Sequence, residues 1–296
     1  MSEPATQGGA VPGAGSPRYT SVTMVLPTYD EAARVRRVIE YYRPFAPILV
    51  VDNESSDGTP EIVRALGLRT VRFANGGTIQ TPEWFRHVAA LIDTDYFVLL
   101  SCSEFLPASL LERFDEIARS RSADVVSCVR RIYTCGELMP EIWGREPRIE
   151  RLFNRAGLDF QRISIHGSFR SLDPSRELHL PSEDRYTASH LRDSDAASLM
   201  KKHTDYGAVE ARHRIEQGNP PGFRWLLSAV WGEIRRYRRV RLLRRGRLAL
   251  REVWARIVMH SIVYWIGWEL RQGRTIEYSR RRSDEIWQQL ARSERG

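Results

Sequence analysis

Lysine is almost absent from this chain, since only Lys201 and Lys202 are lysines and 43 of the 45 basic residues are arginines. Cysteine is also scarce, and Cys102, Cys128 and Cys135 form no pair at metal-ligand spacing, which favours reduced thiols over a disulfide framework or a zinc site. The sequence shows no charged-then-apolar leader and no apolar run of about 20 residues. These absences predict a cytoplasmic protein without a membrane-spanning helix.

Two glycine-rich phosphate-binding motifs are missing as well. No Gly-x-Gly-x-x-Gly follows the first strand-like run, and no glycine-rich loop ends in Gly-Lys-Ser or Gly-Lys-Thr. Dehydrogenases and P-loop enzymes are therefore disfavoured. The 296 residues, 42% of them hydrophobic, are enough for one large domain or for one domain with an appended lobe.

Composition divides the chain into three parts. Residues 1–19 are rich in Gly, Ala, Pro and Ser and carry too few large apolar side chains to offset the cost of ordering, so we predict a disordered tail there. The pattern of residues 20–195 predicts an α/β domain that binds the substrate, and that of residues 196–296 predicts a helical, basic lobe.

Strand-like apolar runs alternate with helical patterns in the α/β domain. This alternation predicts a Rossmann-like, mostly parallel sheet with helices on both faces. Its predicted strands are 22–26, 47–51, 69–73, 96–100 and 125–129, followed by 148–154 and 163–165. Its predicted helices are 31–42, 59–66, 82–91 and 107–119, and those of the lobe are 196–217, 223–243 and 247–271.

Two of the predicted strands end abruptly at small and acidic residues. The strand at 22–26 leads into Pro-Thr-Tyr-Asp-Glu at 27–31, and the strand at 47–51 leads into Asp-Asn-Glu-Ser-Ser-Asp-Gly-Thr at 52–59. Ligands of open α/β sheets bind outside the carboxyl ends of the strands, where a carboxylate can accept hydrogen bonds from a nucleobase or from ribose hydroxyls. We therefore expect one cleft to gather Thr28, Asp30, Glu31, Asp52 and Asn53.

This pair of motifs resembles the start of family 2 glycosyltransferases of the GT-A fold, of the bacterial type that builds surface or lipid-linked glycans. Relatives carry a Val-Val-Asp-Asn-Gly-Ser-Thr-Asp-Gly-Thr-like stretch, from which only Glu54 and Ser56 depart. The resemblance covers about residues 22–200. It implies that Asp30 or Glu31, together with Asp52, holds a nucleotide-diphosphate sugar, in a donor site that also includes Pro27, Thr28, Tyr29 and Asn53.

The next motif of the family is altered in this chain. Relatives show a Leu-Asp-Ala-Asp-Glu-Phe-like stretch whose carboxylates hold Mg²⁺ or Mn²⁺ against the donor diphosphate, whereas residues 100–105 read Leu-Ser-Cys-Ser-Glu-Phe. The resemblance still assigns Ser101, Ser103 and Glu104 to the donor site. A hard divalent cation prefers carboxylate oxygens, and hydroxyls are poor substitutes.

Three consequences of this altered, DxD-like motif stay open. In the first, Glu104 holds the metal together with other ligands, such as His190. This residue matches a histidine that relatives place before a Lys-rich helix. Alternatively, a cationic side chain such as Arg148 or Arg151 replaces the metal, because arginine suits phosphate oxygens. The third consequence is that donor chemistry is weakened or lost.

Inverting transfer needs a base that takes the proton of the acceptor hydroxyl. Asp184 is the first candidate, followed by Glu183 and His166. His166 matches a place where relatives often carry His-Glu, although the acid is replaced here by glycine. The competing interpretations are a solvated loop for the two carboxylates and a structural role for the histidine.

The positive charge is concentrated in the lobe. Between Arg224 and Arg256 there are 11 arginines against Glu233 and Glu252, a net charge of +9 that leaves −1 for the rest of the chain. The nearly apolar run 253–268 is too short to span a bilayer. We expect this segment to lie peripherally on an anionic inner membrane face, with packing against the first domain or a second subunit as the alternative. No nucleic-acid-binding motif accompanies the charge, so no nucleic-acid partner is predicted.

The sequence thus predicts an inverting glycosyltransferase that moves a sugar from a nucleotide-diphosphate donor to a hydroxyl of a glycan or lipid-linked acceptor. The alternative is a catalytically degenerate relative that serves as a membrane-associated partner subunit. Loss of the two aspartates at positions 101 and 103 motivates this alternative.

Overall fold

The computed structural model describes residues 16–74, 81–134, 136–139, 147–160, 169–192, 196–239, 246–274 and 276–293. The chain forms two compact units, one of Met1–Tyr133 with Glu146–Arg192 and the other of Thr134–Arg145 with Asp193–Gly296. The second unit therefore takes in residues 134–145, a segment that lies within the predicted α/β domain.

One half of the sheet in the first unit is parallel. Its strands are β1 (Val22–Thr28), β2 (Ile48–Asp52), β3 (Thr70–Arg72) and β4 (Tyr96–Leu99), in the order β3-β2-β1-β4. The central strands are continuous apolar runs because both of their faces are covered. The predicted α/β class is confirmed.

The other half of the sheet contains antiparallel pairs. Strand β8 (Arg148–Asn154) lies antiparallel between β4 and β6 (Val125–Thr134). Strand β9 (Glu177–His179) pairs parallel with β6, while β10 (Thr187–Arg192) lies between β6 and β5 (Glu104–Phe105) and is antiparallel to β5. Strand β6 continues beyond the predicted end at 129 because strand pairing carries it through charged residues. The predicted strand at 163–165 lies outside the described residues.

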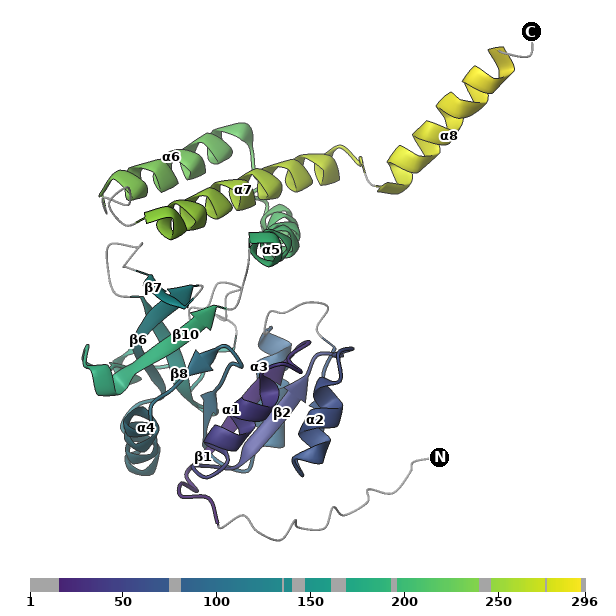
Figure 1. Ribbon diagram of the computed structural model, residues 1–296. Coiled ribbons are helices and arrows are strands. Elements are labelled where there is room, and N and C mark those ends of the chain that lie inside the picture. Colours follow the sequence, from purple (N-terminus) through teal and green to yellow (C-terminus); the bar gives the residue numbers. More distant parts are fainter. Residues whose placement is uncertain are drawn as a thin grey trace, which may run out of the picture. The chain divides into compact units, whose positions relative to one another are not determined.

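Helices cover both faces of the sheet, as predicted (Figure 1). Successive residues of a strand point to opposite faces, so Met24 and Leu26 join a core with α1 (Val35–Tyr42), α2 (Thr59–Ala65) and α4 (Ala108–Ser120). Val25 points the other way and joins a second core with Trp84 and Phe85 of α3 (Pro82–Leu91).

The described residues of the first unit begin at Ser16, within the predicted tail 1–19. Tyr19 is buried, its ring stacks on Phe45 at 6.2 Å, and its backbone N–H donates to the Phe45 carbonyl at 2.6 Å. Burial of an aromatic ring compensates for the ordering of this short segment. Residues 1–15 of the predicted tail lie outside the described residues.

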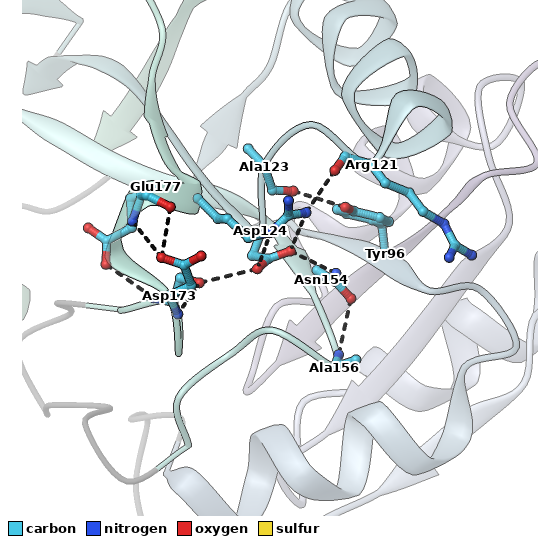
Figure 2. Close-up of polar contacts among 11 residues, drawn as sticks. Tyr96, Arg121, Ala123, Asp124, Asn154, Ala156, Asp173 and Glu177 are labelled. Carbon is cyan, nitrogen blue, oxygen red and sulfur yellow. Dashed lines mark hydrogen bonds and ion pairs between the residues drawn. The ribbon is translucent and has the colours of Figure 1, made fainter.

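A polar network closes the amino end of β6 (Figure 2). The Asp124 carboxylate accepts two hydrogen bonds from Arg176, at 2.7 and 3.0 Å, one from Asn154 Nδ2 at 2.8 Å and one from Ser171 Oγ at 3.3 Å. Burial opposes ionisation of Asp124, but these donors outweigh it and hold the pKa of the carboxyl below its ordinary value. The 3₁₀ turn η1 (Pro174–Arg176) carries the arginine.

The second unit is helical, as predicted for the carboxyl-terminal part. It contains β7 (Glu137–Met139), α5 (Ala196–Glu216), α6 (Phe223–Arg239), α7 (Gly246–Arg271) and α8 (Ile276–Ser293). Helix α7 packs against both α5 and α6. Among the described residues, no helix combines the length and the hydropathy that a transmembrane span requires.

Candidate functional site

The carboxyl ends of β1 and β2 lie side by side. Thr28 and Asp52 are partners in the parallel register, and the Thr28 hydroxyl donates to Asp52 Oδ1 at 2.7 Å. The backbone N–H of Asn53 donates to the Thr28 carbonyl at 2.9 Å. The structure therefore brings together the two strand ends that the sequence motifs placed at one cleft.

The Asp52 carboxylate is used by the chain itself. Its side chain is buried, and besides Thr28 it accepts hydrogen bonds from the backbone N–H of Ser55, at 2.9 Å, and from the Ser55 hydroxyl, at 2.6 Å. Such Asx-type bonds turn the chain directly after a strand. They give Asp52 a clear structural role, that of shaping the loop after β2, while its predicted contact with the donor stays a prediction.

The loop after β1 is fastened to the loop after β2 by reciprocal hydrogen bonds. The Asp30 N–H donates to Ser55 Oγ at 2.9 Å, and Asp30 Oδ1 accepts from the Ser56 N–H at 2.8 Å. Asp30 and Glu54 both adopt left-handed backbone conformations, with φ of 51° and 62°, which cost about 1 kcal/mol each for residues other than glycine. The cross-loop bonds hold this costly geometry in place.

Two further hydrogen bonds link the same two loops. The Ala32 N–H donates to Asp57 Oδ2, and the Glu31 N–H donates to Thr59 Oγ1, both at 2.8 Å. Burial opposes ionisation of Asp57, but hydrogen bonds from Thr59 and Ala32 lower its pKa. Helix α1 begins at Val35 rather than at the predicted residue 31, because residues 32–34 form a turn in which the Arg34 and Val35 N–H groups both donate to the Glu31 carbonyl at 2.9 Å.

The outer side of these loops carries the remaining predicted donor-site side chains. Tyr29 and Asp30 are exposed, Pro27 and Asn53 are half-buried, and Glu31 forms an ion pair with Arg34 at 2.7 Å. An exposed aromatic ring and a carboxylate beside a strand end have the chemistry to contact a nucleoside.

The altered motif after β4 lies next to the same edge of the sheet. The Leu100 N–H donates to the Val25 carbonyl of β1 at 2.8 Å. The hydroxyl oxygens of Ser101 and Ser103 lie 3.0 Å apart, within hydrogen-bond distance of each other. Strand pairing then sets Glu104 opposite His190 of β10. Four of the predicted residues, Ser101, Ser103, Glu104 and His190, are thus gathered at this place.

Glu104 is buried and bound to two arginines. Its Oε2 accepts from Arg151 Nε at 2.8 Å and from Arg151 Nη2, and its Oε1 lies 3.4 Å from Arg130 Nη1. Burial opposes ionisation of this carboxyl group, but the guanidinium groups of Arg151 and Arg130, with His190 nearby, outweigh burial and hold the pKa of Glu104 below its ordinary value.

A β-bulge explains how Arg151 reaches Glu104. In the pairing of β6 with β8, Val126 lies opposite Leu152 while Ser127 lies opposite Glu150. The register shifts between these pairs and gives Arg151 no opposite residue on β6. A bulged residue leaves the strict alternation of a strand, and its side chain is redirected. The bulge thereby allows a charged side chain from a central strand to meet a carboxylate that follows β4.

The described side chains do not fit a divalent metal ion. No group of three His, Cys, Asp or Glu side chains able to hold one occurs among the described residues. Glu104 is paired with two cations through both oxygens, and Ser101 and Ser103 offer only neutral hydroxyls to a hard cation. These ion pairs argue against the predicted role of Glu104, with His190, as a metal ligand.

The candidate bases Asp184 and Glu183 pair with arginines other than those that bind Glu104. Asp184 belongs to the 3₁₀ turn η2 (Asp184–Tyr186), has a side chain that is 86% exposed, and pairs with Arg131 at 2.5 Å. Glu183 pairs with Arg185 at 2.7 Å. Within the described part of the chain, neither carboxylate bonds to a member of the Glu104 cluster, and His166 lies outside the described residues.

Arg130 is the residue of this site that the sequence motifs did not single out. It follows the apolar run 125–129 directly, which is typical of a residue that ends a strand. The available signal was the unusual pair Arg130-Arg131 within a chain segment that otherwise continues with apolar residues. Cys102 and Cys128, in contrast, are free and buried, and burial raises the pKa of the Cys128 thiol to about 12, which disfavours a nucleophilic role.

Known proteins resemble this chain over different lengths. An uncharacterized glycosyltransferase of Rickettsia bellii is 23% identical over 221 residues, which cover 69% of this chain and 71% of that protein. The succinoglycan biosynthesis protein ExoA of Rhizobium meliloti is 33% identical over 116 residues, 36% of this chain and 35% of ExoA.

A solved structure is also similar: the mannosyltransferase PcManGT from Pyrobaculum calidifontis, in complex with GDP-Man and Mn²⁺, has a TM-score of 0.45 and 17% identity over 86% of this chain and 87% of that chain. The strand order and the helices on both faces agree with the predicted GT-A fold. The model of glycosyl transferase family 2 matches residues 23–172, just over half of the chain. The chain therefore belongs to glycosyl transferase family 2.

Proposed function

We propose that this protein transfers a sugar from a nucleotide-diphosphate sugar to an acceptor hydroxyl, with inversion at the anomeric carbon. The observation that carries the proposal is the fastened pair of loops after β1 and β2, built around Thr28, Asp52 and Ser55. These loops border the carboxyl edge of parallel strands, where ligands of α/β sheets bind, and the Ser101–Ser103 stretch lies at the same edge.

In this proposal the two loops bind the nucleoside. The Tyr29 ring, which is exposed, stacks on the base, and the exposed Asp30 carboxylate accepts a hydrogen bond from ribose. Asp52 acts indirectly, since its oxygens hold the loop that positions Asn53. Rigid support of this kind reduces the ordering cost of binding.

The chemical step is an in-line displacement. The acceptor oxygen forms a bond to the anomeric carbon while the bond from that carbon to the diphosphate oxygen breaks, and the nucleoside diphosphate leaves with the bonding electrons. A base takes the acceptor proton. Asp184 is the first candidate for this base because its carboxylate is exposed, with Glu183 and His166 next.

Calorimetry with UDP, GDP and dTDP tests donor binding. We expect one of them to bind the full-length protein, and Tyr29→Ala to weaken that binding about tenfold or more through loss of stacking. Tyr278→Ala is the matched control, because Tyr278 is also exposed but belongs to α8 of the second unit. Failure of all three nucleotides to bind at millimolar concentration would contradict the proposal.

The base is tested separately. Asp184→Asn should lower the turnover number by about 10²–10⁴-fold, the usual contribution of a general base, with donor affinity unchanged. Equal turnover in Asp184→Asn and the unmodified protein would shift the role to Glu183 or His166, for which Glu183→Gln and His166→Ala are the next variants.

We also propose that the second unit binds the surface of an anionic membrane, at the inner face, where a lipid-linked acceptor is presented. Helix α6 carries an exposed apolar stripe with helical spacing, made of Phe223, Leu227, Trp231 and Ile234. Residues at this spacing share one face of a helix.

Helix α7 extends this exposed apolar surface. Its exposed Trp265 contacts Tyr264 at 5.1 Å between ring centroids, and Tyr264 contacts Phe223 of α6 at 6.1 Å. Trp254 and Leu250 are also exposed on α7. The apolar surface is therefore shared by two neighbouring helices, and tryptophans favour the boundary between lipid and water.

Charge favours a membrane over a second copy of the chain as the occupant. The segment between Arg224 and Arg256 has a net charge of +9, and its two acids, Glu233 and Glu252, are buried within the unit. Two such surfaces would repel each other, whereas anionic lipid headgroups attract arginines by about 1 kcal/mol each.

Co-sedimentation with vesicles tests the membrane proposal. The protein should bind vesicles of phosphatidylcholine with phosphatidylglycerol and should bind pure phosphatidylcholine weakly, and Leu227→Ser with Trp231→Ser should reduce binding at least tenfold. Leu172→Ser is the control, because Leu172 is exposed in the first unit. Salt-independent binding, or a dimer that the double variant dissociates, would contradict the proposal.

The alternative function is that of a non-catalytic partner subunit on the membrane. It is supported by the serines at positions 101 and 103, where the family motif has aspartates. Vesicle binding without binding of any nucleotide diphosphate would favour this alternative over glycosyl transfer.

A further inference from the structure

The cluster around Glu104 has an excess of positive charge. Glu104 contributes −1, while Arg130 and Arg151 contribute +1 each, so the three groups sum to +1. His190 lies opposite Glu104 in the strand register, and Arg192 acts electrostatically on Arg130. Glu104, on which these cations converge, follows Ser103 directly in the chain, after the carboxyl end of β4.

The two arginines of the cluster are engaged to different degrees. Arg151 has a side chain only 8% exposed, donates to Glu104 through Nε and Nη2, and donates to the Glu150 carbonyl through Nη1 at 3.0 Å. Arg130 has a side chain 23% exposed and reaches Glu104 through Nη1 at 3.4 Å, while its buried Nε has no hydrogen-bond partner among the described residues. Arg130 therefore keeps donors for another acceptor.

We propose that the Arg130 guanidinium binds the diphosphate of the donor, at the position where the family motif would supply carboxylates for a metal ion. Glu104 and Arg151 are positioning residues, since Arg151 fixes the Glu104 carboxylate and this carboxylate, which follows Ser103 directly in the chain, binds Arg130. This inference rests on the proposed function, because it needs a nucleotide-diphosphate sugar as the ligand.

The chemistry of the groups supports this assignment. A guanidinium presents N–H donors in a planar fork that matches two phosphate oxygens, and it stays charged at any physiological pH. When the bond between the anomeric carbon and the diphosphate oxygen breaks, negative charge grows on the departing diphosphate. A fixed cation in a partly buried site stabilises that charge. A divalent ion stabilises the same charge in metal-dependent enzymes.

Calorimetric titration of UDP, GDP and dTDP, in EDTA and in Mn²⁺, tests the inference on the full-length protein. The unmodified protein should bind one nucleotide equally well in both conditions. Arg130→Gln should weaken this binding about 10- to 100-fold, as expected for loss of hydrogen bonds to a charged group, and Arg130→Lys should weaken it less.

A matched control removes the same charge elsewhere. Arg170→Gln breaks an ion pair with Glu177 of β9, which lies beside Val125 at the amino end of β6. Because this is the opposite end of the strand from the proposed donor site, the nucleotide affinity of Arg170→Gln should be unchanged. Thermal unfolding checks that Arg130→Gln remains folded, as expected because Arg151 still neutralises Glu104. Arg130→Lys keeps a cation beside Glu104 and provides a second, folded readout.

The outcomes separate the inference from the proposed function. No binding in either condition would overturn the proposed function. Binding that requires Mn²⁺, or equal affinity of Arg130→Gln and the unmodified protein, would overturn the inference and leave the proposed function standing. Loss of affinity in Arg130→Gln with an unchanged Arg170→Gln control would support it.

A direct metal titration gives an independent readout. Electron paramagnetic resonance of Mn²⁺ should show no ion bound to the unmodified protein, and it should show binding to the double variant Ser101→Asp with Ser103→Asp, which restores the carboxylates. Stoichiometric Mn²⁺ binding by the unmodified protein at micromolar concentration would overturn the inference.

Discussion

Asp124 and Glu104 are buried carboxylates at opposite strand ends of the same sheet. Their charge and hydrogen-bonding capacity are satisfied by different kinds of partners. Asp124, at the amino end of β6, is bound by one arginine, one amide and one hydroxyl. Glu104, after the carboxyl end of β4, faces two arginines. Burial opposes ionisation of both groups, and in both the bound donors hold the pKa below its ordinary value.

The difference lies in the charge that remains. At Asp124, one cation among the described residues, Arg176, balances the carboxylate, and neutral donors from Asn154 and Ser171 use its other lone pairs. At Glu104 two cations surround one anion, and Arg130 is only loosely engaged at 3.4 Å. A neutral, saturated network stabilises the end of a strand, whereas an unbalanced one leaves charge available for an anionic ligand.

The largest expected effect comes from breaking the Glu104 cluster. Arg151→Gln leaves a buried carboxylate with one loosely bound arginine, so the free energy of unfolding should fall by about 3–5 kcal/mol, as for other broken buried pairs. Urea denaturation measures this change. A loss below 1 kcal/mol would mean that Glu104 is solvated and that the two edges do not differ as described.

An intermediate effect is expected from crowding the Asp124 network. A Cβ added at Gly157 would lie 2.4 Å from Asp124 Cγ, so the network must shift to accept a side chain. Gly157→Ala should lower the free energy of unfolding by about 1–3 kcal/mol, the range for overpacked sites. The same urea titration checks it, with Gly232→Ala as control because the added Cβ there meets nothing within 4 Å.

Removing the arginine of the Asp124 network should cost less than removing Arg151. Asn154 and Ser171 continue to donate to the carboxylate in Arg176→Gln, and the Arg176 side chain is 36% exposed. Both hydrogen bonds from Arg176 are lost, but because this side chain is partly exposed we expect a loss of only about 1.5 kcal/mol, the lower end of the range for hydrogen bonds to a charged group. An effect as large as that of Arg151→Gln would remove the contrast between the two edges.

Acid should weaken the folded state through both carboxylates. Their pKa values are lowered in the folded protein, so their stabilising effect is present above the ordinary values of about 4 and is lost as the pH falls through the lowered values. Thermal unfolding between pH 7 and pH 3 should show this loss, with a shallower dependence in Asp124→Asn. An unchanged slope in that variant would contradict the assigned pKa direction.

Much of the fold could be predicted from local patterns. The apolar runs of β1, β2 and β4 and the helix of residues 82–91 follow directly from periodicity, because a buried strand or an amphipathic helix needs its apolar residues at fixed spacing. The meeting of Thr28 with Asp52 was also predictable, since parallel strands end at one edge. The continuation of β6 beyond residue 129 was not, because pairing with other strands such as β10 overrides local composition.

The cluster at Glu104 shows where local patterns cease to be informative. The chain alone indicates that the aspartates of the family motif are serines and that Glu104 remains. It does not indicate that a register shift in β8 releases Arg151 from strand alternation, or that Arg130 lies against the same carboxylate. Those contacts join residues 26 and 47 positions apart. Short-range preferences set the strands and turns, whereas long-range pairing sets which charges meet and how they are balanced.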